Sequence, residues 1–195
     1  LSFPQISTFG KSRNKAVISW SSDKGAIDPN PKYAVASGFS SGGQNIYVDS
    51  HLIKSPSLNY YDEYVMDMAS DGTNFIFAII TYDKKVEKKI QLSMIITNSL
   101  FEPVSSYNLI TDSNGEVKDL SNPKISVNDN GIGVMIWGEN SNPPSTQSQE
   151  AYVVFNSKTG EISQRRLLNE ISTSWGNYDV EVLNDGRVGI IGASD

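Results

Sequence analysis

The chain repeats one strand–turn–strand pattern four times, and this repeat constrains its fold more than any other feature. Each copy opens with a short strand-like segment centred on Ile6, Val65, Ile125 or Val180, and these centres are 59, 60 and 55 residues apart. A turn follows, which in three copies contains Asp-Gly or Asn-Gly, the dipeptides that supply the positive φ values of a tight hairpin. Self-similarity at a period of this length predicts stacked supersecondary units.

Two further strands are expected in each complete copy, the first after a longer loop and the second after a short turn. The chain is therefore expected to hold three four-stranded units and the first half of a fourth, with approximate bounds 1–58, 59–118, 119–173 and 174–195. These units form a single β-repeat domain or a piece of a larger propeller. The expected strands cover, column by column, 5–7, 64–66, 124–126 and 179–181; 16–20, 75–80, 134–137 and 188–191; 33–39, 90–97 and 151–155; and 44–48, 104–110 and 162–168.

The second strand of each unit indicates how the units pack. The segments AVISW (16–20), FIFAII (75–80) and VMIW (134–137) are apolar at successive positions, whereas a strand with one wet face would alternate. These strands need cover on both faces, which units stacked face to face provide. We therefore predict an all-β fold, a β-propeller-like repeat of about three and a half four-stranded antiparallel blades, with Trp20 and Trp137 at equivalent places. A β-sandwich or jelly roll is the alternative, although it does not require a four-strand repeat.

Two segments resemble known propeller blades. The run P-x-I-x-V-N-D-x-G-x-x-x-x-I-W (123–137) resembles the blade repeats of bacterial secreted and surface proteins, and the likeness extends loosely over all the units. It implies an extracytoplasmic protein, secreted or at the cell surface. FNSKTGEIS (155–163) resembles the turn of quinoprotein-type blades, but Ile162-Ser163-Gln164 stands where those blades carry a docking Trp. No quinone cofactor is therefore expected.

SSDKGAI (21–27) resembles part of the sialidase Asp-box, Ser-x-Asp-x-Gly-x-Thr-Trp. Ser21, Asp23 and Gly25 match the box, whereas Ile27 and Asp28 stand where Thr and Trp belong. The segment also lies between the second and third expected strands, while the box normally lies between the third and fourth. The box is a turn and implies no catalysis by itself. The four arginines of the chain are spread out, unlike the carboxylate-clamping arginine cluster of sialidases.

Composition excludes several function classes. The net charge is −6 and the pI is near 4.8, which argues against general affinity for nucleic acid, because phosphate binding needs clustered Lys and Arg. Without cysteine the chain has no disulfide, no thiolate metal site and no cysteine nucleophile. No apolar run approaches the roughly 20 residues that cross a bilayer, so no membrane span is expected.

Candidate catalytic and metal-binding residues each have a simpler interpretation. His51 is the only histidine and is expected in a surface loop after a fourth strand. Asp62 and Glu63 precede the strand that carries Asp67; paired carboxylates can perform acid–base chemistry, but these are interpreted as solvated acids. The basic run KKVEKK (84–89) is interpreted as a solvated hairpin tip. We therefore predict no catalytic residue, no cofactor and no metal.

Loop lengths indicate which end of the units binds. Turns of about four to six residues lie at one end, and much longer loops and crossings lie at the other. Tyr60, Tyr61 and Trp175 belong to the long-loop end and are the candidate ligand-binding residues, for stacking on a sugar or gripping a peptide. Alternatively, they pack between neighbouring units. The long segments are 21–32, 83–89, 138–150, 55–63 and 169–177.

The sequence therefore favours a non-enzymatic binding or interaction module of a bacterial secreted or surface protein, with a glycan or protein ligand. A fragment of a glycan-processing, sialidase-like hydrolase is the alternative. The chain opens with Leu1 rather than Met and is expected to be a processed or excised product. Its two ends cannot complete one blade together, so we expect either flanking blades or an oligomer. Two copies would hold seven units.

Overall fold

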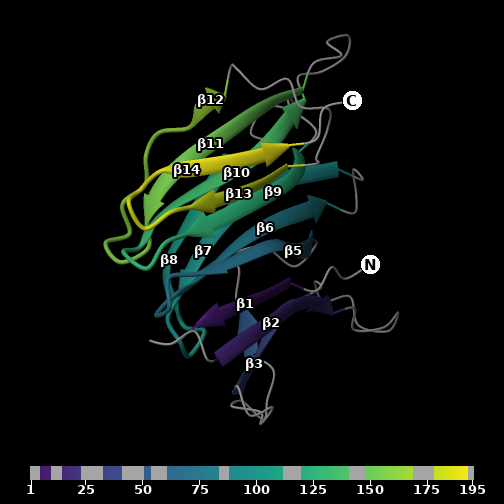
Figure 1. Cartoon of the computed structure of the whole chain (residues 1–195). Helices are drawn as coiled ribbons and strands as arrows, with labels where there is room; N and C mark the ends of the chain where they lie inside the picture. The colour runs from purple at the N-terminus through teal and green to yellow at the C-terminus, as the bar shows by residue number, and fades with distance from the viewer. Residues whose placement is uncertain are drawn as a thin grey trace.

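The computed structural model describes residues 5–9, 15–22, 33–40, 51–53, 61–83, 88–111, 120–140, 148–168 and 178–192. Within these ranges the chain contains strands and turns but no helix, and all strand pairs are antiparallel (Figure 1). This confirms the prediction of an all-β chain in which strands that are consecutive in sequence pair antiparallel.

Three sheets have four strands each and one has two. We number the sheets 1 to 4 in chain order. In each four-stranded sheet, every strand pairs with the strands of that sheet that come directly before and after it in the chain. Sheet 1 holds β1 (Gln5–Phe9), β2 (Lys15–Ser22), β3 (Tyr33–Ser40) and β4 (His51–Ile53); sheet 2 holds β5 (Tyr61–Ser70), β6 (Phe75–Asp83), β7 (Lys88–Thr97) and β8 (Pro103–Thr111); sheet 3 holds β9 (Leu120–Val127), β10 (Ile132–Asn140), β11 (Ser148–Asn156) and β12 (Arg166–Leu168); sheet 4 holds β13 (Tyr178–Val182) and β14 (Val188–Gly192).

The strand register confirms that Trp20 and Trp137 occupy equivalent backbone positions. Trp20 lies on β2 and Trp137 on β10, the second strands of their sheets. Trp20 comes two residues after Ile18, which pairs with Ile6 on the first strand. Trp137 likewise comes two residues after Met135, which pairs with Ile125.

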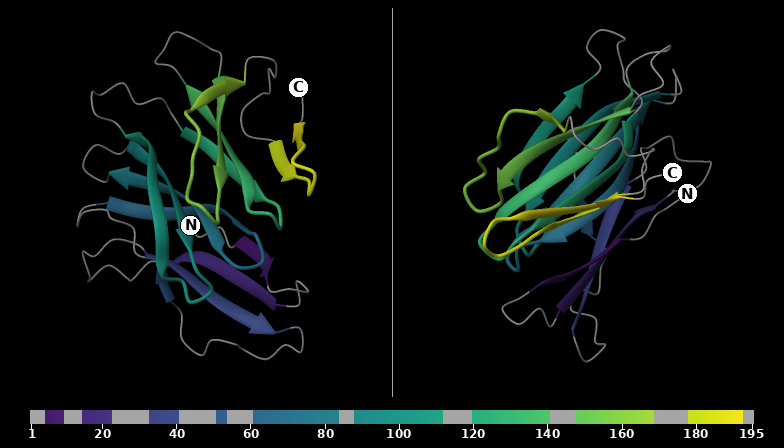
Figure 2. Two further views of the ribbon diagram at one scale, coloured as in Figure 1. Left: turned by 90° about the vertical axis from the view of Figure 1, so that its left-hand side faces the viewer. Right: turned by 45° about the horizontal axis from the view of Figure 1, so that its top comes forward.

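The sheets stack in chain order, and their first strands β1, β5, β9 and β13 are successive neighbours (Figures 1 and 2). We call the face of a sheet that meets the preceding sheet its backward face, and the other its forward face. Three apolar clusters fill the spaces between sheets 1 and 2, 2 and 3, and 3 and 4. A stack of four sheets differs from a β-sandwich, which has two facing sheets.

The second strands of the two middle sheets are covered on both faces, as predicted from their apolar runs. On β6, residues 75–80 are all buried, and alternate side chains enter the cluster before and the cluster after the sheet. On β10, residues 134–137 behave in the same way. Continuous apolar strands are thus explained by sandwiching between neighbouring sheets.

The fourth strands agree with the prediction only in sheet 2, where β8 includes the expected residues 104–110. The expected strand 44–48 lies outside the described residues. β4 covers His51–Ile53, so His51 is a strand residue and not a loop residue. β12 covers only Arg166–Leu168 instead of 162–168. Ile162 forms an isolated antiparallel bridge with Phe155, but the Val154 N–H is accepted at 2.9 Å by the Ser163 hydroxyl instead of a backbone carbonyl, so the ladder is interrupted before Arg166.

Candidate functional site

Among the described residues, the first strand of each sheet pairs only with its own second strand, so its other backbone edge is not part of a sheet ladder. Unpaired N–H groups on such an edge need acceptors. The Asp67 carboxylate on β5 accepts the Ile125 N–H of β9 at 2.8 Å. The Ser126 hydroxyl on β9 accepts the Val182 N–H of β13 at 3.0 Å. In both cases a forward-facing side chain of one sheet accepts an amide of the next first strand.

Asp67, Ser126 and Glu181 occupy the same place in three successive first strands. Ser126 and Glu181 directly follow the central apolar residue of their strands, whereas Asp67 follows Val65 after one inserted residue, Met66. All three lie on the forward face. Their partners on the second strands are Ala78, Val134 and Gly189.

Charged groups gather beside this position. Burial raises the pKa of Asp67 above its ordinary value of 3.8, and the negative charge of Asp179 adds to the rise. The hydrogen bond from the Ile125 N–H and the positive charge of Lys124 oppose it. Asp67, Lys124 and Asp179 come from β5, β9 and β13 respectively, and we call them the inner-strand row. The row combines two carboxylates and one ammonium group across three sheets.

The interpretation of Asp62, Glu63 and Asp67 as solvated acids needs correction. All three lie on β5, and Asp67 is half-buried against the next sheet. A shift in the pairing of β5 with β6 between Val65 and Asp67 inserts an extra residue, which places Asp67 on the forward face. The side chains of Asp62 and Glu63 lie outside the described part. A polar residue at the same repeat position in three first strands was the signal that could have identified Asp67.

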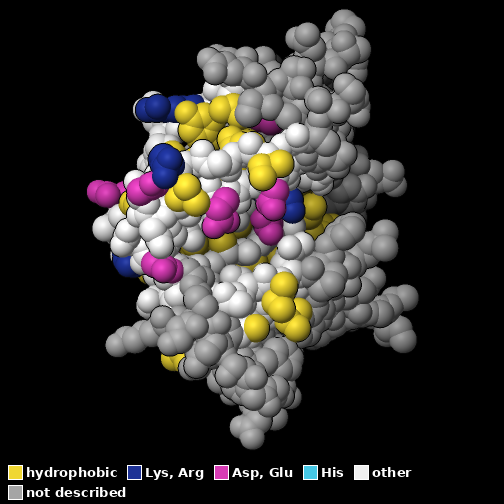
Figure 3. Space-filling view, viewed as in Figure 1, with side chains coloured by type: hydrophobic (Ala, Val, Ile, Leu, Met, Phe, Trp, Pro, Cys, Tyr) yellow, Lys and Arg dark blue, Asp and Glu magenta, His cyan; other side chains and the backbone are white. Residues whose placement is uncertain are grey.

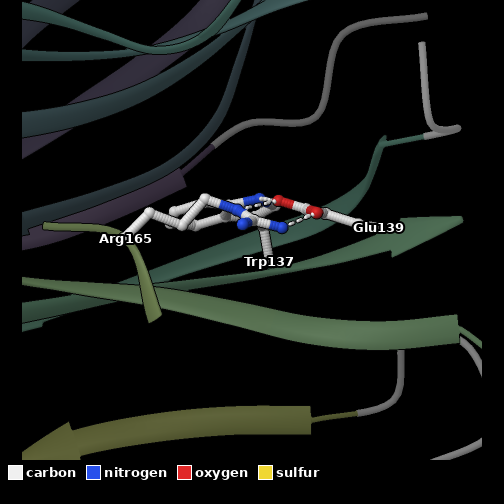
Figure 4. Close-up of polar contacts among 3 residues, drawn as sticks. All are labelled: Trp137, Glu139 and Arg165. Atoms are coloured by element: carbon white, nitrogen blue, oxygen red, sulfur yellow. Dashed lines mark hydrogen bonds and ion pairs between the residues drawn. The ribbon is translucent and has the colours of Figure 1, made fainter. Parts of the chain in front are cut away.

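A second polar cluster joins Trp137, Glu139 and Arg165 in sheet 3 (Figure 4). The Glu139 side chain is 2% exposed, and its Oε1 accepts the Trp137 indole N–H at 2.9 Å and the Arg165 Nε–H at 2.7 Å. Arg165 Nη2 donates to the other carboxylate oxygen. This hydrogen bonding to Glu139 raises the pKa of Arg165, against the opposing effect of burial. The cluster is a forked ion pair that holds Arg165 beside Trp137.

Segment 138–150, which we expected to be a long binding loop, is partly strand. Residues 138–140 belong to β10 and 148–150 to β11, and both Glu139 and Glu150 are buried. The Tyr178 hydroxyl donates to the Asn122 carbonyl at 2.9 Å, and burial raises the pKa of Tyr178, reinforced by the Glu150 charge. Strands extend into polar sequence here because these side chains find partners or cover within the stack.

The predicted ligand-binding aromatics lie at the edge of the described structure. Tyr60 and Trp175 fall outside the described residues, and Tyr61 is the first residue of β5, with its side chain outside them. Their role stays a prediction. Within the described ranges no group of three or more acidic or histidine side chains could hold a metal ion. The same ranges contain no helix of the length and apolarity needed to cross a membrane.

A shallow cleft of about 230 Å³ lies at the opposite, short-turn end, between sheets 3 and 4. The Asn128 side-chain amide donates to the Leu183 carbonyl at 2.9 Å, and the Asn130 amide donates to the Asn184 carbonyl at 3.2 Å. These bonds tie the two turns together. The cleft lining is Val127, Asn128, Asp129, Glu181, Val182, Leu183 and Asn184.

Two solved structures share this arrangement of sheets. The sucrose-6-phosphate hydrolase of Lactobacillus gasseri aligns with a TM-score of 0.50 and 10% identity over 92% of this chain and 39% of its own. The polysaccharide lyase Uly1 aligns with a TM-score of 0.57 and 9% identity over 96% of this chain and 46% of its own. The chain thus spans less than half the length of either enzyme. No protein-family model and no curated protein sequence matches it. At such identities the likeness concerns the fold alone.

Proposed function

We propose that the chain forms consecutive blades of a β-propeller, of the kind found in bacterial secreted and surface proteins, and that its inner-strand row binds a glycan. The observation that carries the proposal is the row itself. Asp67, Lys124 and Asp179 place charged groups on three neighbouring first strands, where several blades can contact one ligand. The fold that the chain shares with two carbohydrate-acting enzymes supports a sugar as that ligand.

The chemistry of the row suits a sugar. A carboxylate can accept hydrogen bonds from neighbouring hydroxyl groups, and an ammonium group can donate to hydroxyl or carboxylate oxygens. Asp179 is exposed and Lys124 half-buried, so both can reach a ligand, whereas the Asp67 carboxylate is engaged with the Ile125 N–H. Tyr60, Tyr61 and Trp175, by the sequence prediction, would add stacking surfaces at the long-loop end.

A glycan array followed by titration calorimetry tests this proposal. We expect the wild-type chain to bind at least one acidic or neutral glycan, and Asp179→Asn and Lys124→Met each to weaken that binding by about tenfold, since each removes one charged contact. Asp185→Asn is the matched control, because Asp185 is exposed at the opposite end in the β13–β14 turn. Binding that is unchanged in both row variants, or absent for every glycan, would refute the proposal.

Glycan cleavage is the second candidate function, favoured by the raised pKa of Asp67 near the Asp179 carboxylate. Two carboxyl groups in different environments can divide the acid and base roles of glycoside cleavage. The test is turnover of chromogenic glycosides and release of unsaturated products from uronate polysaccharides. Activity that disappears in both Asp67→Asn and Asp179→Asn supports cleavage by these residues. Activity that persists in either variant, or no turnover at all, argues against it.

A further inference from the structure

The first sheet exposes a residue that every later sheet buries. Ile6 occupies the central first-strand position, which Val65, Ile125 and Val180 occupy in the other sheets. Those three residues are buried on the backward faces of their sheets, against the preceding sheet. Ile6 is 68% exposed. The backward face of sheet 1 therefore has the apolar residue of an inter-sheet contact without a described neighbour to cover it.

The last sheet shows the same feature on its forward face. Ile191 lies opposite Asp179, at the position that Ile80 and Ile136 hold in sheets 2 and 3. Ile80 and Ile136 are buried against the next sheet, whereas Ile191 is 80% exposed. It borders a small hollow whose other lining residues are Asp179, Val180, Glu181 and Gly189.

The polar part of the inter-sheet contact is also present on that face. Glu181 has the repeat position of Asp67 and Ser126, which each accept a backbone N–H from the following first strand. Glu181 is exposed on β13. Its Oε2 accepts the Ser126 hydroxyl of sheet 3 at 3.4 Å, and the carboxylate has further acceptor capacity for one more first strand. The forward face of sheet 4 thus offers both the aliphatic residue and the hydrogen-bond acceptor that join sheets 2, 3 and 4.

We propose that a second copy of this chain occupies this face, with the backward face of its sheet 1 packed on the forward face of sheet 4. The argument is continuity with the interfaces already formed. The contact would place Ile6 of the second copy, in the role of Val180, beside Ile191, and an amide of its β1 near Glu181. Exposed hydrophobic side chains over β1–β2 and over β13–β14 appear on the same side of the molecule (Figure 3). In the proposed pair this contact forms twice, once at each end, so that the two copies close on each other.

The molecular mass in solution tests this assembly. Light scattering after size exclusion should give about twice the 21.4 kDa of one chain. Ile6→Lys and Ile191→Lys should each lower the dimer affinity by at least tenfold, because each buries a charge in the contact. Leu100→Lys is the matched control, since Leu100 is 58% exposed in the β7–β8 turn, away from both end faces. Circular dichroism should show unchanged β structure in all three variants.

Mixing the two variants distinguishes the head-to-tail arrangement from a contact between identical faces. An Ile6→Lys chain retains an intact sheet 4 and an Ile191→Lys chain an intact sheet 1, so a mixture should recover one good contact and form mixed dimers. If the dimer instead formed by contact between two identical faces, mixing the two variants would produce no mixed dimers.

Covalent capture provides a separate readout, because the chain has no cysteine of its own. Ile6→Cys mixed with Ile191→Cys should form a mixed disulfide dimer faster than either variant pairs with itself. A wild-type chain that stays monomeric, with no preferential cross-link, would overturn the proposal and leave flanking sheets as the natural cover of both faces.

Discussion

At the scale of single residues, position in the stack decides what a carboxylate does. Asp67 and Glu139 are both strand acids in sequence surroundings that a local pattern would call exposed. Asp67 completes the backbone edge of the next sheet, and Glu139 accepts hydrogen bonds from an indole and a guanidinium. Each has a partner that lies far along the chain, Ile125 for Asp67 and Arg165 for Glu139, and these hydrogen bonds offset part of the cost of burying the carboxylate.

Asp67 should make stability depend on pH in a direction opposite to most acids. Because its folded-state pKa is raised, the native state binds the proton more tightly than the unfolded state. Stability from this group is present at low pH and is lost as pH rises from 3.8 through the raised pKa. In urea unfolding, the stability of the wild type relative to Asp67→Asn should therefore fall as pH rises from about 3 to about 7.

The matched control for this prediction is Asp185→Asn. A hydrogen bond from Arg187 lowers the pKa of Asp185, so its contribution is present above 3.8 and is lost as pH falls through the lowered pKa. The relative stability of the wild type should then rise with pH. Parallel slopes for the two variants would contradict the assignment of Asp67.

Arg165 should contribute measurably to stability, unlike its neighbour Arg166. Arg165→Ala leaves the buried Glu139 carboxylate with one charged partner fewer, and we expect a loss of about 1–3 kcal/mol in the free energy of unfolding. The expected loss is smaller than for a fully buried ion pair, because the Arg165 side chain is 34% exposed and solvent weakens its attraction to Glu139. Arg166→Ala, at an exposed position of β12, should change it by less than about 0.5 kcal/mol. Equal effects of the two substitutions in urea unfolding would disprove this.

At the scale of elements, sheet 3 shows how one pair of residues specifies a strand contact. Gly133 on β10 lies opposite Phe155 on β11, and the Phe155 ring covers the glycine Cα. A Cβ at Gly133 would lie 2.2 Å from Phe155 Cζ, and Phe155 is itself buried. The glycine therefore serves close approach of an aromatic ring rather than a turn.

Gly133→Ala should destabilise the protein by about 1–3 kcal/mol, because the ring must leave its packed position. Gly189→Ala is the control on β14, where a Cβ would meet nothing nearer than the Glu181 carbonyl oxygen at 4.0 Å. That variant should differ from the wild type by less than about 0.5 kcal/mol. Adding Phe155→Leu should recover part of the Gly133→Ala loss, and strict additivity in thermal unfolding would argue against the ring contact.

At the scale of the whole molecule, the stack has a protected middle and two open ends. The second strands of sheets 2 and 3, β6 and β10, are covered on both faces, whereas β13 and β14 contact the rest of the described structure through one face. Local stability follows buried apolar contact, so it should fall towards sheet 4. The same asymmetry leaves Ile6 and Ile191 exposed.

Hydrogen exchange should reveal this gradient in the Ile6→Lys chain, in which no second copy covers sheet 4. Amides of β6 and β10 should exchange most slowly, and those of β14 at least about tenfold faster, because opening the last hairpin exposes little of the core. The measurement is residue-resolved exchange by NMR, with β7 as a second central reference. Uniform exchange across the four sheets would show that the stack opens as a single unit.

Much of the fold could be predicted because the same order of apolar strand segments and turns recurs along the chain. The spacing of Ile6, Val65, Ile125 and Val180 located the first strands, and apolar runs such as FIFAII predicted sheets covered on both faces. The fourth strand of sheet 2 matches its predicted range, whereas β12 is shorter than predicted, because the Ser163 hydroxyl replaces a backbone acceptor near its expected start. Edge strands carry a weak apolar signal, so their bounds depend on local detail.

The sequence by itself determined the all-β class, the period of the repeat and the equivalence of Trp20 and Trp137, because pairing and face alternation are properties of short segments. Only the tertiary structure decided that Asp67 meets Ile125, which is 58 residues away, and that Glu139 is buried with Arg165. The physical reason is that the cost of burying a charge depends on partners from distant segments, Ile125 in the next sheet for Asp67 and Arg165 within sheet 3 for Glu139, and such partners leave no local pattern.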